Sequence, residues 1–327
     1  MKSNRKKEAI FQPVAAPIYT LEDEITDDSL FEPLDDAEKQ TDVISRPSLT
    51  YWQNAWQKLR RDPLAMAGIV VIILMILLAI FGPLIQPYTY DGQDYSAINQ
   101  TPNAQHWFGT DKFGRDLFVR VAYGARISLT VGFAAAAINM VIGVLYGGIS
   151  GYVGGSVDMV MMRIVDIISA IPSLLIIILV MVFLGANMKS ILIALCLTYW
   201  IGTARQVRGQ ILSIKNQDFA LAAKVIGESD FQILLRHLVP NSMGPIIVTV
   251  TFLIPQAIFY EAFLSFIGIG ISVPVASWGT LANDSLANMN LYPHLMLFPA
   301  VAISITMFAL NFIGDGLRDS LDPRLKK

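Results

Sequence analysis

The chain has 327 residues; 54% are hydrophobic, 15% are charged, and the formal net charge at pH 7 is −2. Soluble domains average about 45–50% apolar and about 25% charged residues, so this composition argues against a soluble enzyme and for an integral membrane protein. The one cysteine, Cys196, excludes an intrachain disulfide, and the sequence has no Cys/His spacing typical of a metal site. We expect no metal, no cofactor bound by this chain and no nucleic-acid partner.

Residues 1–48 are acidic and poor in core-forming side chains, which predicts a disordered cytoplasmic tail. Basic residues open the chain, but no apolar run of about 7–15 residues follows them, so a signal peptide is not expected. A docking role of the tail on a partner is the less favoured alternative. Residues 49–63 place Trp52, Trp56 and Leu59 on one helical face, which predicts an interfacial helix lying on the membrane before the first span.

Several apolar stretches approach or exceed the ~18–20 residues that cross a bilayer. The predicted fold is an all-α integral membrane protein with six transmembrane helices, at about 64–85, 125–150, 159–184, 190–212, 242–266 and 293–314. The second of these is rich in Gly and Ala, which predicts close packing against a neighbouring helix. The sequence GDGLRD at 314–319 predicts a turn that ends the last span.

Basic residues indicate which ends of the spans face the cytoplasm. They gather before the first span, in the loop after the fourth, and in the C-terminal segment 317–327, so both termini are predicted to be cytoplasmic. One loop disagrees, because 86–124 is predicted to be extracytoplasmic yet contains three basic residues: Lys112, Arg115 and Arg120. Two aspartates in the same loop partly offset these charges.

The segment 218–240 is polar on one face and lies between two spans. Asp218 is a candidate N-cap for a helix over 219–226, and Gly227 offers the left-handed conformation that ends a helix. Ser229 and Gln232 have capping-box spacing for a second helix, which would run to about residue 238 before Pro240 enters the fifth span.

This segment would present Ala222 and Ala223 as small surfaces, with Phe219, Phe231 and Leu235 as apolar knobs. Apolar surface exposed to the cytoplasm favours a protein partner that covers it. An amphipathic hairpin resting on the bilayer is the alternative.

Polar groups inside the spans are candidates for a pathway or a gate. Asp166 either takes such a role or, as the favoured reading, pairs with Arg163 at i, i+3. Glu261 either faces the pathway or anchors the loop that follows it, and Asn139 lies inside the second span. Arg205 and Arg208 lie near the inner end of the fourth span, where snorkelling to lipid headgroups is the simplest interpretation.

The sequence lacks the motifs of an ATPase or a hydrolase. A phosphate-binding P-loop needs Gly-Lys followed by Ser or Thr, and no Gly-Lys dipeptide occurs in the chain. Neither a GxSxG elbow nor an HExxH motif is present. The chain is therefore not expected to be an enzyme, and no catalytic residue is assigned.

Four segments carry a resemblance to a known family. Ala222, Ala223, Gly227 and Pro240 have the spacing of the permease "EAA" loop, although Leu221 replaces its Glu, and RHLVPN at 236–241 resembles the peptide-importer form of that loop. HWFGTDKFGRDLFVRVAYGARISL (106–129), EAFLSFIGIG (261–270) with SWGT (277–280), and NFIGDGLRDSLDPRLKK (311–327) resemble the same branch. The chain thus resembles the permeases of oligopeptide, dipeptide and nickel ABC importers, closest to the second, oligopeptide-type permease.

The resemblance implies a type I importer permease core at 125–316 with a coupling loop at 213–240, in a multi-pass protein of the bacterial plasma membrane. It implies a second homologous permease subunit, two cytoplasmic ATPase subunits that bind ATP and Mg, and an extracytoplasmic peptide-binding protein. It also implies that the coupling loop docks on one ATPase. The candidate coupling residues are Asp218, Ala222, Ala223, Gly227, Glu228, Phe231, Arg236, His237 and Pro240.

The expected function is import of oligopeptides. The same architecture with dipeptide, glutathione or nickel as cargo is an alternative. An ion-driven secondary transporter is less favoured, because such proteins have paired half-repeats with acidic groups near the midplane, and we see no convincing repeat here.

Overall fold

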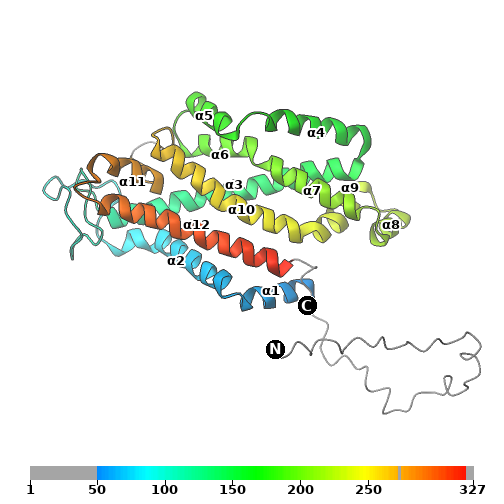
Figure 1. Ribbon diagram of the computed structural model, residues 1–327, viewed down its shortest axis with the longest axis horizontal. Coiled ribbons are helices and arrows are strands. Elements are labelled where there is room, and N and C mark those ends of the chain that lie inside the picture. Colours follow the sequence, from blue (N-terminus) through cyan, green and yellow to red (C-terminus); the bar gives the residue numbers. More distant parts are fainter. Residues whose placement is uncertain (1–49, 272–273, 322–327) are drawn as a thin grey trace, which may run out of the picture. The chain divides into compact units, whose positions relative to one another are not determined.

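The computed structural model describes residues 50–271 and 274–321 (Figure 1). The acidic tail predicted at 1–48 and the last six residues of the predicted C-terminal segment lie outside these described residues. In the described part, the secondary structure is helical, and its only β-type pairing is an isolated bridge between Thr110 and Asp116.

Five helical stretches of the described chain are long and apolar enough to cross a membrane. They are α2 (Pro63–Ile85), α3 (Leu117–Val153), α6 with α7 (Met188–Thr198 and Trp200–Ile214), α9 (Asp230–Gln232) continuing through the π-helix η2 (Ile233–Leu238) into α10 (Val239–Phe266), and α12 (His294–Leu321). The helices α4 (Gly155–Ser169) and α5 (Ser173–Leu184) together make a sixth candidate, but they are bent by 76°. The fold is thus all-helical with five or six candidate spans.

The predicted third span, 159–184, is not one straight helix. The helix breaks between Ala170 and Pro172, where the proline has no backbone N–H to continue the hydrogen-bond ladder. Figure 1 shows α4 and α5 as two separate helices along one side of the bundle. A shorter interruption at Tyr199 separates α6 from α7.

Two other boundaries differ from the sequence-based prediction. The second predicted span begins at Leu117 rather than near 125, with Asp116 accepting a hydrogen bond from the Val119 N–H as its N-cap. The prediction of a turn at 314–319 was wrong, because α12 continues as a helix to Leu321. Gly314 and Gly316 do not break it; they allow close contact with Phe252 and Ala65.

Helix α3 packs against α7 through a row of glycines spaced four residues apart: Gly143, Gly147 and Gly151. A Cβ at Gly143 would lie 2.5 Å from the Cβ of Thr203, and one at Gly151 would lie 2.9 Å from the carbonyl oxygen of Arg208. Small residues at this spacing let two helix backbones approach closely, which matters in lipid because there is little hydrophobic drive between helices.

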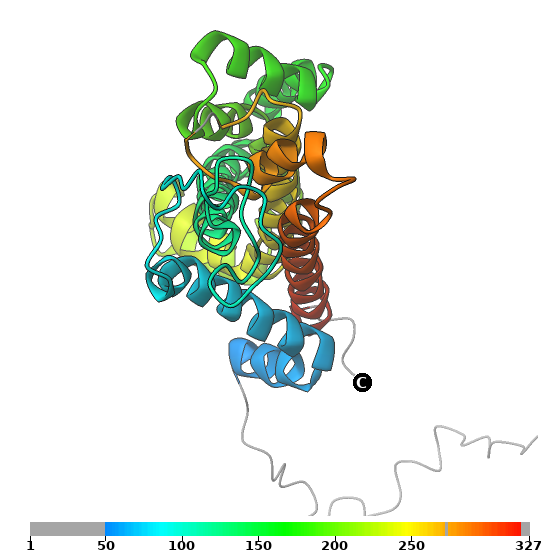
Figure 2. The same cartoon turned by 90° about the vertical axis from the view of Figure 1, so that its left-hand side faces the viewer.

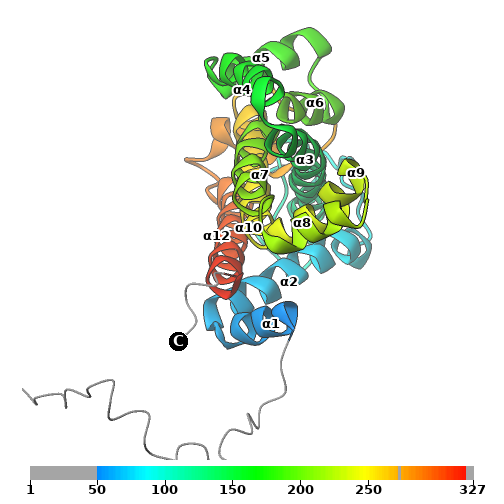
Figure 3. The same cartoon turned by 90° about the vertical axis from the view of Figure 1, so that its right-hand side faces the viewer.

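The two ends of the bundle carry different elements. One end, here named the α11 end, holds the loop of residues 86–116, α11 (Trp278–Ser285) and the short 3₁₀ helix η3 (Leu286–Asn288) (Figure 2). The opposite end, named the α8 end, holds α8 (Asp218–Val225), α9 and α1 (Tyr51–Arg61) (Figure 3).

The predicted interfacial helix is α1. Thr50 and Gln53 cap it in a reciprocal capping box. Leu59 is buried, whereas Trp52 and Trp56 are about half exposed, as suits rings that lie at a membrane surface. The Tyr51 hydroxyl donates to the backbone carbonyl of Leu321 at 3.0 Å, so α1 is fastened to the end of α12.

The basic residues that disagreed with the predicted orientation are paired with aspartates at the α11 end. Arg115 Nε lies 2.7 Å from Asp111 Oδ2, and the fully buried Arg120 lies 3.3 Å from both Asp111 and Asp284. Lys112 Nζ lies 3.5 Å from Asp284. We name Asp111, Arg115, Arg120 and Asp284 the α11 ion cluster. Because its two arginines are paired with aspartates, this loop carries less unpaired positive charge than its sequence suggests.

Candidate coupling surface

Helix α8 begins one residue earlier than predicted. Its N-cap is Gln217, which makes no side-chain capping bond, and Asp218 is the first helical residue rather than the cap. A carboxylate in the first turn still favours the helix, because it faces the positive end of the helix dipole.

Gly227 ends α8 in the left-handed conformation that the sequence predicted, with φ at +89°. The backbone N–H of Glu228 donates to the carbonyl of Ala223 at 3.2 Å, and that of Gly227 to the carbonyl of Lys224 at 3.1 Å. A Cβ at Gly227 would meet no atom within 4 Å. The glycine is therefore required by its backbone conformation and not by lack of space.

The predicted capping box forms after Gly227. The Gln232 N–H donates to Ser229 Oγ at 3.4 Å, and the Ser229 N–H donates to Gln232 Oε1 at 3.0 Å. The helix that follows is not a separate unit ending near residue 238, because α9, η2 and α10 form one continuous helix. Pro240 therefore lies inside this continuous helix, two residues after η2, and supplies no backbone N–H to its hydrogen-bond ladder.

One face of this segment is anchored in the bundle. The side chains of Ala220, Ala223, Ile233, Leu234 and Leu238 are buried, and they pack with Val207 and Ile211 of α7. Phe219, predicted as an exposed knob, is half buried in the same cluster.

The opposite face is apolar and exposed. The exposed fraction is 88% for Val225 and 81% for Ile226, and Leu221, Phe231 and Leu235 are also exposed. Ala222 lies on this face, whereas Ala223 is buried. We name these five large side chains (Leu221, Val225, Ile226, Phe231 and Leu235) the α8 patch. Apolar side chains that project this far from a buried base are typical of a surface that a partner covers.

Hydrogen bonds connect this segment with the end of α3. The Tyr152 hydroxyl donates to Asp230 Oδ1 at 2.6 Å. Lys215 Nζ donates to the carbonyls of Gly151 and Tyr152 at 2.9 and 3.2 Å, which satisfies the last carbonyls of α3. These bonds fasten the residues on either side of α8 to the end of α3.

The remaining candidate coupling residues lie around the same turn. His237 Nε2 lies 2.7 Å from Glu228 Oε2, so these two side chains connect the turn after Gly227 with the π-helix η2. Arg236 is exposed on η2.

The intramembrane candidates are engaged with the protein itself. Asp166 pairs with Arg205 at 2.9 Å and not with Arg163, and Ser169 also accepts from Arg205. Arg205 is thus held by a carboxylate instead of only snorkelling. The same holds for Arg208, whose guanidinium binds both carboxylate oxygens of Asp158.

Glu261 and Asn139 are fully buried. Glu261 accepts hydrogen bonds from the hydroxyls of Ser128 at 2.7 Å and Ser265 at 2.9 Å, and Ser265 Oγ accepts from the backbone N–H of Ile271. This arrangement supports the anchoring interpretation of Glu261. Asn139 Nδ2 donates to the carbonyl of Ala135 at 2.6 Å.

Three polar side chains that were not predicted from the sequence line a groove between α7, α10 and α12: Gln206, Gln210 and Gln256. A signal was present, since Gln206 and Gln210 are four residues apart in one predicted span and so share a helix face.

A family model described as the binding-protein-dependent transport system inner membrane component matches residues 116–327. The chain belongs to this family. A second model, the N-terminal TM domain of oligopeptide transport permease C, matches residues 50–102.

Characterised relatives are similar over most of the chain. The dipeptide transport system permease protein of Bacillus subtilis is 48% identical over 291 residues, 88% of this chain and 91% of the relative. The oligopeptide transport system permease protein of the same organism is 48% identical over 299 residues, 91% of this chain and 98% of the relative. The Escherichia coli K12 oligopeptide permease is 43% identical over 295 residues, 90% and 97% of the two chains.

A solved structure supports the fold. An inward-facing MetNI methionine ABC transporter chain matches with a TM-score of 0.51 and 18% identity, covering 62% of this chain and 96% of that one. Together with the family match, this makes the chain a multi-pass bacterial membrane protein and a permease subunit of an ABC importer, in which the ATPase is a separate subunit.

Proposed function

We propose that this permease forms half of the translocation pathway of an oligopeptide importer and receives its mechanical input through residues 218–236. The observation that carries the proposal is the α8 patch: Val225 and Ile226 are almost fully exposed beside Gly227, on a segment whose other face is buried. Water-exposed apolar side chains on a rigid base are suited to docking in a groove of a partner. The partner in this proposal is a cytoplasmic ATPase subunit that binds ATP and Mg.

The proposed topology has six spans, with α4 and α5 together counted as one, and both termini in the cytoplasm. The α8 end then faces the cytoplasm, and the α11 end faces outward. Two arguments support this orientation: the basic residues that gather at the α8 end, and the pairing of the discordant arginines within the α11 ion cluster. A second homologous permease would supply the other half of the pathway, and an extracytoplasmic binding protein would deliver cargo.

The cargo proposed is an oligopeptide, because the second family model is that of an oligopeptide permease. Dipeptides are the second candidate, since the dipeptide permease of Bacillus subtilis is as similar to this chain as the oligopeptide permease. Peptides of two to six residues, offered to the complete importer together with its binding protein, distinguish these two cargo classes.

The docking proposal is tested by placing a charge in the α8 patch. Val225→Glu changes an 88% exposed side chain, so the fold should tolerate it, whereas a docked charge would be desolvated without a partner. Leu291→Glu is the matched control, because Leu291 is 77% exposed near the α11 end. We expect Val225→Glu to reduce co-purification of the ATPase and peptide uptake. Equal ATPase recovery with the two variants would contradict the proposal.

A further inference from the structure

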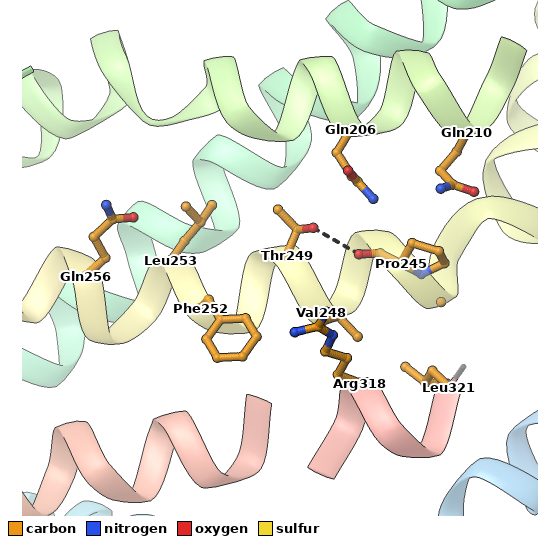
Figure 4. Close-up of a pocket in the computed structure, with 11 residues that line it drawn as sticks. Gln206, Gln210, Pro245, Val248, Thr249, Phe252, Leu253, Gln256, Arg318 and Leu321 are labelled. Carbon is orange, nitrogen blue, oxygen red and sulfur yellow. Dashed lines mark hydrogen bonds between the residues drawn. The ribbon is translucent and has the colours of Figure 1, made fainter. Parts of the chain in front are cut away.

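An open groove of about 730 Å³ lies between α7, α10 and α12 (Figure 4). This volume is within the ~300–1,000 Å³ range of ligand sites. Five of the eleven lining residues are polar: Gln206, Gln210, Thr249, Gln256 and Arg318. The others are apolar or glycine, and the lining contains no carboxylate.

The glutamines of the groove have unused hydrogen-bonding groups. Each amide offers two N–H donors and one carbonyl acceptor, and none of the three makes a side-chain hydrogen bond within the described parts of the chain. Thr249 differs, because its hydroxyl donates to the carbonyl of Pro245 at 3.0 Å. Unpaired amides are costly in hydrocarbon, so the groove is suited to water or a polar ligand and not to lipid tails.

Peptide backbone has the chemistry that these amides match. Every peptide unit except that of proline presents one N–H and one C=O, and a glutamine amide can pair with either. Neutral amides do not select among charged side chains of the cargo. Val248, Phe252 and Leu253 add apolar surface, whose contacts are not directional. The lining as a whole therefore suits recognition of a peptide backbone and does not select a particular amino-acid sequence.

Arg318 adds one positive charge to the groove. Figure 4 shows its guanidinium reaching from α12 toward α10, and no carboxylate among residues 50–271 and 274–321 lies within ion-pair distance of it. A guanidinium binds a carboxylate through two parallel hydrogen bonds, and every unmodified peptide carries one carboxylate at its C-terminus.

We propose that this groove is a transit site for peptides, in which Gln206, Gln210 and Gln256 pair with the peptide backbone and Arg318 pairs with the C-terminal carboxylate. The inference rests on the proposed function and adds where this chain holds its cargo. A helix of the second permease or a lipid headgroup seated in the groove are the competing occupants, and the experiments below separate them.

The first experiment measures water and peptide access in the complete importer, assembled in lipid nanodiscs. Cys196 is the one native cysteine of this chain, so Cys196→Ala gives a background for single Gln206→Cys and Gln256→Cys variants. Leu74→Cys, at an exposed apolar position in the middle of α2, is the control. Labelling by a charged thiol reagent is expected to be at least about tenfold faster in the groove than at the control, because lipid excludes the charged reagent.

Millimolar pentaalanine should slow labelling at the groove positions. Labelling as slow as at Leu74→Cys would overturn the proposal in favour of a helix in the groove. Fast labelling without protection by the peptide would overturn it in favour of a water-filled space or a lipid headgroup.

The second experiment tests Arg318 with a peptide and its C-terminal amide. Arg318→Gln should reduce uptake of the free acid by about tenfold, equal to about 1.4 kcal/mol, and should leave uptake of the amide within about twofold of that by the unmodified importer. Comparing the same two peptides in both importers cancels any preference of the binding protein. Arg60→Gln, an exposed charge on α1, is the matched control.

An equal loss for both peptides, or no loss, would overturn the assignment of Arg318. Failure of the unmodified importer to take up either peptide would instead contradict the proposed function, so the two failures are distinguishable.

Discussion

The glycine row of α3 allows a quantitative test of the helix packing. In Gly143→Ala the new Cβ would lie 2.5 Å from the Cβ of Thr203 and 3.1 Å from the carbonyl oxygen of Trp200. Carbon atoms pack at about 3.5–4.0 Å, so α3 and α7 must separate by about 1 Å. Overpacking of this kind costs about 1–3 kcal/mol.

A separation of about 1 Å also weakens the neighbouring contacts, because a gap of that size forfeits about a quarter to a half of the dispersion energy of each contact. Alanine also stabilises the helix by up to about 1 kcal/mol relative to glycine, because its helix propensity is higher. The matched control is Gly209→Ala on α7, where a Cβ meets nothing within 4 Å, so only the propensity gain remains. The two variants should therefore differ by about 1–3 kcal/mol.

The assay is the midpoint temperature at which the fluorescently tagged complex loses its monodisperse elution peak. At about 2–4 °C for each kcal/mol, Gly143→Ala should melt about 2–12 °C below Gly209→Ala. Gly143→Leu should melt lower still or fail to assemble. Equal midpoints for the two alanine variants would refute the assignment of the glycine row as the contact between α3 and α7.

Three further predictions concern single contacts. Arg126 donates to the carbonyl of Ala79, which lacks its helical N–H partner because residue 83 is proline. Arg126→Met should therefore lower the midpoint temperature, and adding Pro83→Ala should reduce that loss. An undiminished loss in the double variant would argue against this capping role of Arg126. Gly227→Val should cost about 1–2 kcal/mol through its left-handed backbone, with Gly227→Asn milder in the same melting assay; identical effects would exclude backbone strain as the cause. Tyr152→Phe removes the bond to Asp230 and should lower peptide uptake per ATP hydrolysed while the ATPase still co-purifies; unchanged stoichiometry would count against α3 as the transmitting helix.

Local signals in the sequence were sufficient where short-range geometry decides the structure. The left-handed Gly227 and the capping box of Ser229 and Gln232 follow from spacing alone. The span 64–85 likewise needs no partner to be recognised, since it contains no charge.

Local sequence signals failed where a residue distant in the sequence determines the contact. Asp166 binds Arg205, 39 residues away, in preference to the neighbouring Arg163. Gly314 looked like a helix break, but Phe252 of another helix fills the space that a side chain would need. The groove glutamines were overlooked for a related reason, because a polar residue in a span acquires meaning only when other helices place it beside a cavity.

The start of α3 shows the same limit. Arg115 and Arg120 lie in the predicted loop 86–124, and Arg120 belongs to α3 although charged groups are expensive in a span. Asp111 and Asp284 pair with both arginines, and the Asp116 cap starts the helix at Leu117.

The α11 ion cluster also sets an order of events during synthesis. Asp284 follows Arg120 by 164 residues, and at about 5–20 residues per second it emerges about 8–33 s later. Only Asp111 accompanies Arg120 while α3 is being inserted. The charge balance at the α11 end is therefore completed late, after α11 has been made. The last third of the chain thus supplies the second carboxylate partner of Arg120, on a helix that begins in the first half.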